Sequence, residues 1–118
     1  TARDFCHVDN VVQANLLAAA VENPEALDQA YNVALGEQTS LNELFDMIRT
    51  ALAPRLPHLR TVRAVHREPR AGDLPFSRAD ISKAERLLGY RPQVRIGKGL
   101  QRTIDWYADH LLETLNAA

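Results

Sequence analysis

The spacing between apolar residues changes several times along this chain, which predicts alternating strands and helices. Phe5–Val8 is rich in strand-forming residues, and Asp9 suits the N-cap of a helix that runs to about Val21. That helix is apolar around most of its circumference, so it requires cover on more than one side. A second, buried strand is expected at Tyr31–Leu35, where Gly36 stops it.

The second half of the chain predicts three more helices and one more strand. Ser40–Glu43 has the pattern of a capping box, which begins a helix that ends before Pro54. Thr61–Val65 alternates and is β-branched, which indicates a third strand. Asp80 is expected to cap a short helix over Ile81–Leu88. One face of the last helix is made by Leu100, Ile104, Tyr107, Leu111 and Leu115.

The order of elements, β-α-β-α-β-α-α, predicts an α/β fold in which short strands pair in parallel through the connecting helices. With 118 residues, of which 46% are hydrophobic and 25% charged, the chain is one globular domain or one piece of a larger one. Three short strands make a small sheet for this much helix, and the chain has no initiator methionine. We therefore expect it to be cut from something longer.

Charge and cysteine content narrow the class of protein. The 14 basic and 15 acidic residues give a net charge of −1, which argues against a dedicated nucleic-acid binder. No apolar run approaches the roughly 20 residues that span a bilayer. The single cysteine, Cys6, excludes a disulfide within the chain and a cysteine-built zinc site. Without a signal-peptide pattern, a cytoplasmic protein that contacts neither membrane nor nucleic acid is expected.

The charges are unevenly placed along the chain. Residues 21–46 carry six acids and no Lys or Arg, whereas residues 54–71 carry five arginines and two histidines against one acid, Glu68. Arginine binds phosphate and carboxylate in a planar, bidentate manner. The arginine-rich segment is therefore either a solvated surface or an anion site.

The chain has no self-sufficient catalytic or metal-binding constellation. Its five glycines form no phosphate loop, its four histidines are scattered, and Cys6 and His7 would point to opposite faces of a strand. Two places could bind an anion. Arg3 lies at a strand edge where it could hold a phosphate, and Arg70 and Asp73 flank Gly72 in a turn that could grip phosphate and hydroxyl groups together. Alternatively, Arg3 and Asp4 form a surface ion pair of little energetic value, and the segment from Arg70 to Asp73 is an ordinary loop.

A series of short motifs runs in order along essentially the whole chain: Arg3-Asp4-Phe5, Tyr31-Asn32-Val33, Thr39-Ser40-Leu41, Arg70-x-Gly72-Asp73, Ala79-Asp80-Ile81-Ser82-Lys83-Ala84, Leu87-Leu88-Gly89-Tyr90 and Ile104-x-Trp106-Tyr107. This series resembles the C-terminal part of extended short-chain dehydrogenase/reductases, the NAD-dependent nucleotide-sugar epimerases and dehydratases. Arg-Asp-Phe-Cys with the following helix is most similar to bacterial UDP-N-acetylglucosamine 4-epimerases of surface-polysaccharide synthesis.

The resemblance implies a fold, a division of the chain and a set of ligand contacts. The chain would be the substrate-binding portion of an NAD(P)-binding Rossmann-like fold whose core is largely missing. Residues 1–38 would complete the Rossmann half, and residues 39–118 would form the sugar-nucleotide-binding domain. Arg3 and Arg70 would contact the diphosphate and Asp73 the ribose hydroxyls of UDP. Ser77 falls where some relatives have a bulky aromatic, so it would leave room for an N-acetyl group, unless it is only a loop serine.

The resemblance also implies what this chain lacks. The family's NAD-binding loop and its Tyr-x-x-x-Lys catalytic pair lie N-terminal to the matched part, and none of Tyr31, Tyr90 and Tyr107 is followed by lysine four residues on. We therefore expect the parent enzyme to bind NAD. In this chain by itself we expect no bound cofactor, no catalytic residue and no activity. Self-association through exposed apolar surface is expected. The alternatives are a dehydratase fragment and an autonomous, non-catalytic nucleotide- or protein-binding module.

Overall fold

The computed structural model describes residues 1–117, apart from the side chains of Leu112 and residues 115–117, and every structural statement below refers to this part of the chain. It contains the helices α1 (Val8–Ala20), α2 (Leu41–Leu52), α3 (Ser82–Leu88) and α4 (Ile96–Ala117). Two 3-10 helices, η1 (Pro24–Ala26) and η2 (Pro57–Thr61), and two short strands, β1 (Ala2–Arg3) and β2 (Thr39–Ser40), complete it.

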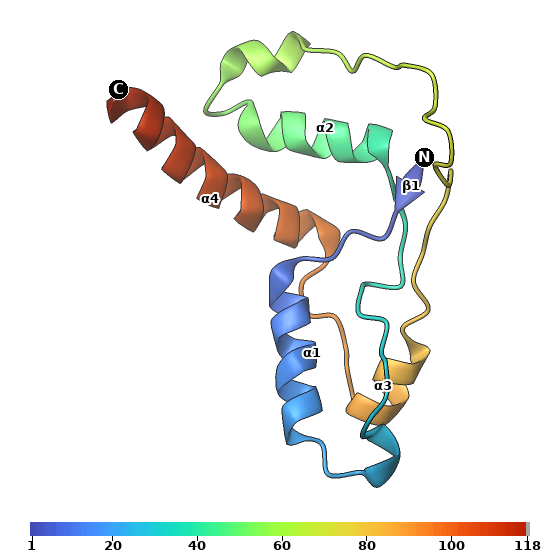
Figure 1. The fold of residues 1–118 in the computed structure, drawn as a ribbon. Coiled ribbons are helices and arrows are strands. Elements are labelled where there is room, and N and C mark those ends of the chain that lie inside the picture. The colour runs from blue at the N-terminus through green and yellow to red at the C-terminus, as the bar shows by residue number, and fades with distance from the viewer. Residues whose placement is uncertain (118) are drawn as a thin grey trace.

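The helices form two groups, as Figure 1 shows. α1 and α3 lie side by side with η1 at one end, and α2 packs against α4 and η2 at the other. The core between α1 and α3 consists mainly of alanines, together with Ile81, Leu88 and the fully buried Tyr90. The hydroxyl of Tyr90 donates a hydrogen bond to the carbonyl of Ala34 (2.7 Å), and this bond satisfies the one polar group of the ring.

The helix starts follow local capping chemistry. Ser40 and Glu43 form the expected capping box, in which each side chain accepts from the other residue's backbone N–H. Asp80 accepts from the amide of Ser82 (3.0 Å), but the expected cap is wrong by one residue, because α3 begins at Ser82 and its N-cap position is Ile81, which makes no side-chain cap hydrogen bond. The expected cap of α1 is wrong by two residues, because the Nδ1 of His7 accepts from the amide of Asp9 and the helix begins at Val8.

The three strands expected from the sequence are absent from the described residues, and the only sheet pairs β1 with β2 in antiparallel register. Residues 31–35 form no strand, and two of their backbone groups bind side chains: Asp4 accepts the amide of Leu35, and Tyr90 donates to the carbonyl of Ala34. Residues 62–65 have no strand partner, and every residue from 60 to 78 is exposed. The expected parallel pairing is therefore wrong, apart from an isolated parallel bridge between Ala2 and Phe76.

The molecule is extended and leaves apolar surface uncovered. Its radius of gyration is 17.8 Å, against about 13.5 Å for a compact domain of this length. Its accessible surface is 8735 Å², against about 6400 Å² for a folded monomer of this mass. On α1, only Asn10 and Ala14 are buried, while Val8 and Leu16 are about two-thirds exposed. This helix therefore lacks the cover that its sequence pattern requires.

α4 departs in part from its expected apolar face. Ile104 is buried and Leu100 is half-buried, but Tyr107 and Leu111 are exposed, and the side chain of Leu115 lies outside the described residues. The helix begins at Ile96, so Gly97 and Gly99 lie inside its first turn. In the part of the chain that the structure describes, no helix has both the length and the apolar character needed to cross a membrane.

Candidate functional site

The segment that follows the arginine-rich loop runs beside β1, so two of the candidate binding residues lie close to each other. The amide of Ala2 donates to the carbonyl of Pro75 (2.8 Å), and the amide of Ser77 donates to the carbonyl of Ala2 (3.1 Å). In Figure 1 this yellow segment passes directly alongside β1. Ser77 is thereby held next to Arg3, although 74 positions separate the two in the sequence.

The side chain of Arg3 pairs with no carboxylate of the described residues. It is half-buried, and its Nη1 donates only to the carbonyl of its neighbour Ala2 (2.9 Å). A guanidinium has five N–H donors, so most of its hydrogen-bonding capacity remains for a ligand. The sequence interpretation of Arg3 and Asp4 as a surface ion pair is wrong, because Asp4 binds backbone amides instead.

Arg70 and Asp73 face each other across a tight turn. The Nε of Arg70 lies 3.2 Å from the Oδ2 of Asp73, and the amide of Asp73 donates to the carbonyl of Arg70 (3.2 Å). Gly72 has a φ of +85°, which an L side chain rarely adopts. The side chain of Arg70 is 88% exposed, so water screens this pair and it contributes little to stability. Both groups are therefore available to a ligand.

Ser77 is exposed, and its hydroxyl makes no hydrogen bond to any other residue between 1 and 117. Within the described chain, no hydrogen bond or ion pair joins the Arg70–Asp73 turn to Arg3, so the structure arranges the four candidate residues as two pairs rather than as one closed site.

Asp4 makes long-range contacts that the sequence interpretation did not predict. Its Oδ1 accepts the amide of Leu35 (3.0 Å), and its Oδ2 accepts the amides of Gly36 (2.9 Å) and Ala79 (3.3 Å). These residues lie 31 to 75 positions away in the sequence. The only sequence signal was its place directly after Arg3 in the Arg-Asp-Phe motif.

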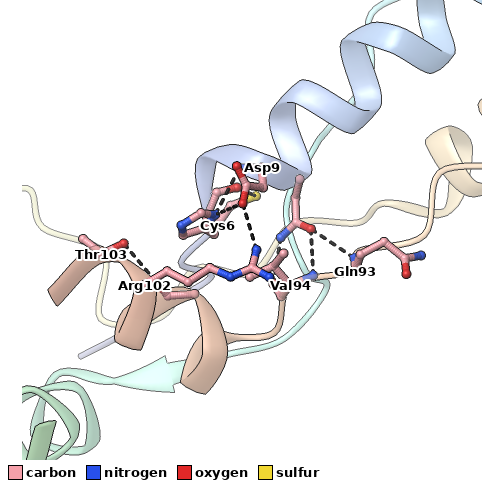
Figure 2. Close-up of polar contacts among 9 residues, drawn as sticks. Cys6, Asp9, Gln93, Val94, Arg102 and Thr103 are labelled. Carbon is pink, nitrogen blue, oxygen red and sulfur yellow. Dashed lines mark hydrogen bonds and ion pairs between the residues drawn. The ribbon is translucent and has the colours of Figure 1, made fainter. Parts of the chain in front are cut away.

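Cys6 and His7 have local structural contacts. Burial raises the pKa of the Cys6 thiol, which disfavours the nucleophilic thiolate, and its Sγ donates to the carbonyl of His7. Just beyond them, the carboxylate of Asp9 accepts a hydrogen bond from Arg102 of α4 (2.9 Å), which ties α1 to α4 (Figure 2).

A second polar feature is a surface cavity to which Ala79 contributes. Its volume is about 670 Å³, and it is lined by Arg78, Arg91 and Arg95, together with Asp80 and Glu85. Arg95 is already paired with the carboxylate of Glu37 (2.6 Å). Because acidic groups nearly balance the arginines, the cavity has little net positive charge.

The chain is similar to known sugar-nucleotide enzymes, although no family model matches it. It is 35% identical over 104 residues to a putative UDP-glucose 4-epimerase of Methanocaldococcus jannaschii, and 36% identical over 106 residues to a UDP-glucose 4-epimerase of Mycolicibacterium smegmatis. These matches cover 88% and 89% of the chain. The chain spans only 30% and 31% of the length of these curated relatives.

Two solved structures show the same fold. The crystal structure of the Thermotoga maritima UDP-glucose 4-epimerase with UDP-glucose aligns with a TM-score of 0.79 and 31% identity, over 93% of this chain and 32% of the enzyme. The chain has the fold of the C-terminal third of a short-chain dehydrogenase/reductase-type epimerase. The Bordetella bronchiseptica enzyme WbmF, solved with NAD+ and UDP, aligns with a TM-score of 0.69 and 27% identity, over 95% of this chain and 31% of that enzyme. The expected fold class of this epimerase portion is thus confirmed.

Proposed function

We propose that this chain is the sugar-nucleotide-binding portion of an NAD-dependent UDP-sugar 4-epimerase. One observation carries the proposal: in an epimerase-type fold, the segment that follows the Arg70-x-Gly72-Asp73 turn lies against β1 and sets Ser77 beside Arg3. In this proposal, residues 1–38 pack against the Rossmann half and residues 39–118 bind the sugar nucleotide. The matched relatives named as UDP-sugar 4-epimerases support it.

The four residues have separate roles in this proposal. Arg3 and Arg70 bind the diphosphate, because both guanidinium groups retain free donors. Asp73 accepts hydrogen bonds from the ribose hydroxyls, for which a carboxylate offers two acceptor oxygens. Each charge-assisted bond contributes about 1.5–3 kcal/mol. The ligand would replace the weak, exposed ion pair between Arg70 and Asp73.

For the sugar, we propose UDP-N-acetylglucosamine on the strength of the small, exposed Ser77. The relatives named above are UDP-glucose 4-epimerases, and other matched relatives are named UDP-glucuronate 4-epimerases. In the complete enzyme, Ser77→Tyr is expected to reduce turnover of the N-acetylated substrate more than turnover of UDP-glucose. If this variant turns over the N-acetylated substrate as well as the original enzyme does, Ser77 does not control the sugar pocket.

The cofactor belongs to the remainder of the enzyme in this proposal. NAD supplies hydride transfer when it is bound, but this chain offers no glycine-rich loop for a dinucleotide, because its five glycines lie in separate turns and in α4. The role of the chain is accordingly to bind and orient the sugar nucleotide.

A chimeric enzyme tests the proposal directly. The C-terminal third of the Thermotoga maritima enzyme is replaced by this chain, and 4-epimerisation of UDP-glucose, UDP-N-acetylglucosamine and UDP-glucuronate is followed with added NAD. Arg70→Ala should raise the KM for the UDP-sugar at least tenfold, which is the loss of about 1.4 kcal/mol. The matched control is Arg67→Ala, an exposed arginine of the same loop. A folded, NAD-binding chimera that turns over none of the three sugars would refute the assignment.

We also propose that the isolated chain self-associates through α1. The supporting feature is the exposed apolar row that includes Val8, Val12 and Leu16. Light scattering should show a mass that rises with concentration, and Leu16→Glu should lower it. A strict monomer at high concentration would contradict this proposal.

A further inference from the structure

The carboxylate of Asp4 joins three segments that are distant in sequence. It accepts amides from Leu35 and Gly36, which precede β2, and from Ala79, which follows the candidate ligand-binding segment. Both carboxylate oxygens are used, and the Oδ2 accepts two N–H groups. Hydrogen bonds to an ionised acceptor are stronger than those between neutral groups, so this residue is a strong local anchor.

These bonds place Arg3 between two fixed points. On one side, Ala2 exchanges backbone hydrogen bonds with Pro75 and Ser77, and on the other side Asp4 holds Ala79. The same five-residue segment, 75–79, is therefore bound both before and after Arg3. β1 is only two residues long, so its own pairing with β2 provides little restraint.

We propose that Asp4 is a positioning residue for the diphosphate site. It fixes Arg3 relative to the segment that carries Ser77 and follows the Arg70–Asp73 turn, and it acts through Arg3 rather than on the ligand. This inference rests on the proposed function, because it presumes that Arg3 binds the diphosphate.

Asp4→Asn is the informative variant. A carboxamide keeps one acceptor oxygen and replaces the other by an N–H₂ donor, which cannot accept the amides now bound by that atom. Asp9→Asn is the matched control: it makes the same charge change five residues away, and Asp9 contacts neither Gly36 nor Ala79. Asp4→Glu keeps the charge but moves the oxygens by one methylene, and it replaces Asp4→Asn if that variant does not fold.

The test follows backbone amides of the 118-residue chain by nuclear magnetic resonance, without and with millimolar UDP. In Asp4→Asn, the amides of Gly36 and Ala79 should shift and exchange faster, and the amide of Arg3 should shift with them. UDP affinity should fall roughly tenfold, while uridine affinity stays unchanged because uridine has no diphosphate. Asp9→Asn should leave all of these values as in the original chain.

A double-mutant cycle separates positioning from general loss of structure. If Asp4 acts through Arg3, then Arg3→Ala combined with Asp4→Asn weakens UDP binding no more than Arg3→Ala does. Additive losses, or unchanged UDP affinity in Asp4→Asn, would overturn the positioning role while leaving the nucleotide site in place. A chain that gives no UDP-dependent shifts at all would instead overturn the proposed nucleotide site, and the positioning role with it.

Discussion

Replacing Asn10 by alanine should destabilise the fold strongly, although the residue lies on a helix that is mostly exposed. Asn10 is fully buried, and it makes three hydrogen bonds to the segment that precedes α4. Its Nδ2 donates to the carbonyl of Val94 (2.8 Å), and its Oδ1 accepts the amides of Gln93 and Val94 (both 3.0 Å). Figure 2 draws these bonds beside the contact between Asp9 and Arg102.

The expected loss follows from these three bonds. Each contributes about 1 kcal/mol net, and alanine leaves buried backbone groups unpaired, so we expect a loss of about 3 kcal/mol. For a domain of this size, that corresponds to a fall in Tm of roughly 10–20 °C. Thermal unfolding followed by circular dichroism measures it. Asn15→Ala, an exposed change on the same helix, is the control and should leave Tm nearly unchanged.

Asn10→Asp tests whether instability comes from lost hydrogen bonds or from lost side-chain volume. The shape is retained, but an ionised carboxylate faces the Val94 carbonyl, to which it cannot donate. The folded state therefore raises the pKa of this new carboxyl group, so stability should be highest at low pH and fall as pH rises through that pKa. A Tm of Asn10→Ala within a few degrees of the original chain would refute the reasoning.

Three further predictions concern packing, burial and capping. Gly99→Ala should be destabilising despite the better helix propensity of alanine, because its Cβ would lie 2.9 Å from the Cβ of His7. Gly97→Ala is the control: its Cβ would lie 3.9 Å from the nearest atom, so it should be neutral or stabilising, and chemical denaturation compares the two variants. Burial raises the pKa of Tyr90 from 10.0 to about 12, so the folded state should lose stability as pH rises through this interval. Thermal melting curves at alkaline pH measure the loss, and Tyr90→Phe should abolish it. Hydrogen bonds from the Ser40 amide and hydroxyl lower the pKa of Glu43, so amide protection at the start of α2 should decline as pH falls through that pKa, and Glu43→Gln should remove the decline.

The sequence was informative wherever the determining interactions are local. The capping box of α2 and the approximate positions of the four helices follow from residues three or four positions apart. The motif series also predicted the epimerase-type fold, which the solved structures confirm. The roles of Arg3, Arg70, Asp73 and Ser77 stay predictions, since they require a ligand.

Tertiary structure decided the sheet and the anchoring of the site. A β-branched run such as 61–65 becomes a strand only when a neighbouring strand pairs with its backbone, and nothing in the described chain does so. Residues 31–35 likewise look like a buried strand, yet Asp4 and Tyr90 take the backbone groups that a strand would pair. Local sequence cannot show which distant amides a carboxylate or an asparagine will bind. The importance of Asp4 and Asn10 therefore became visible only when segments up to 84 positions apart lay side by side.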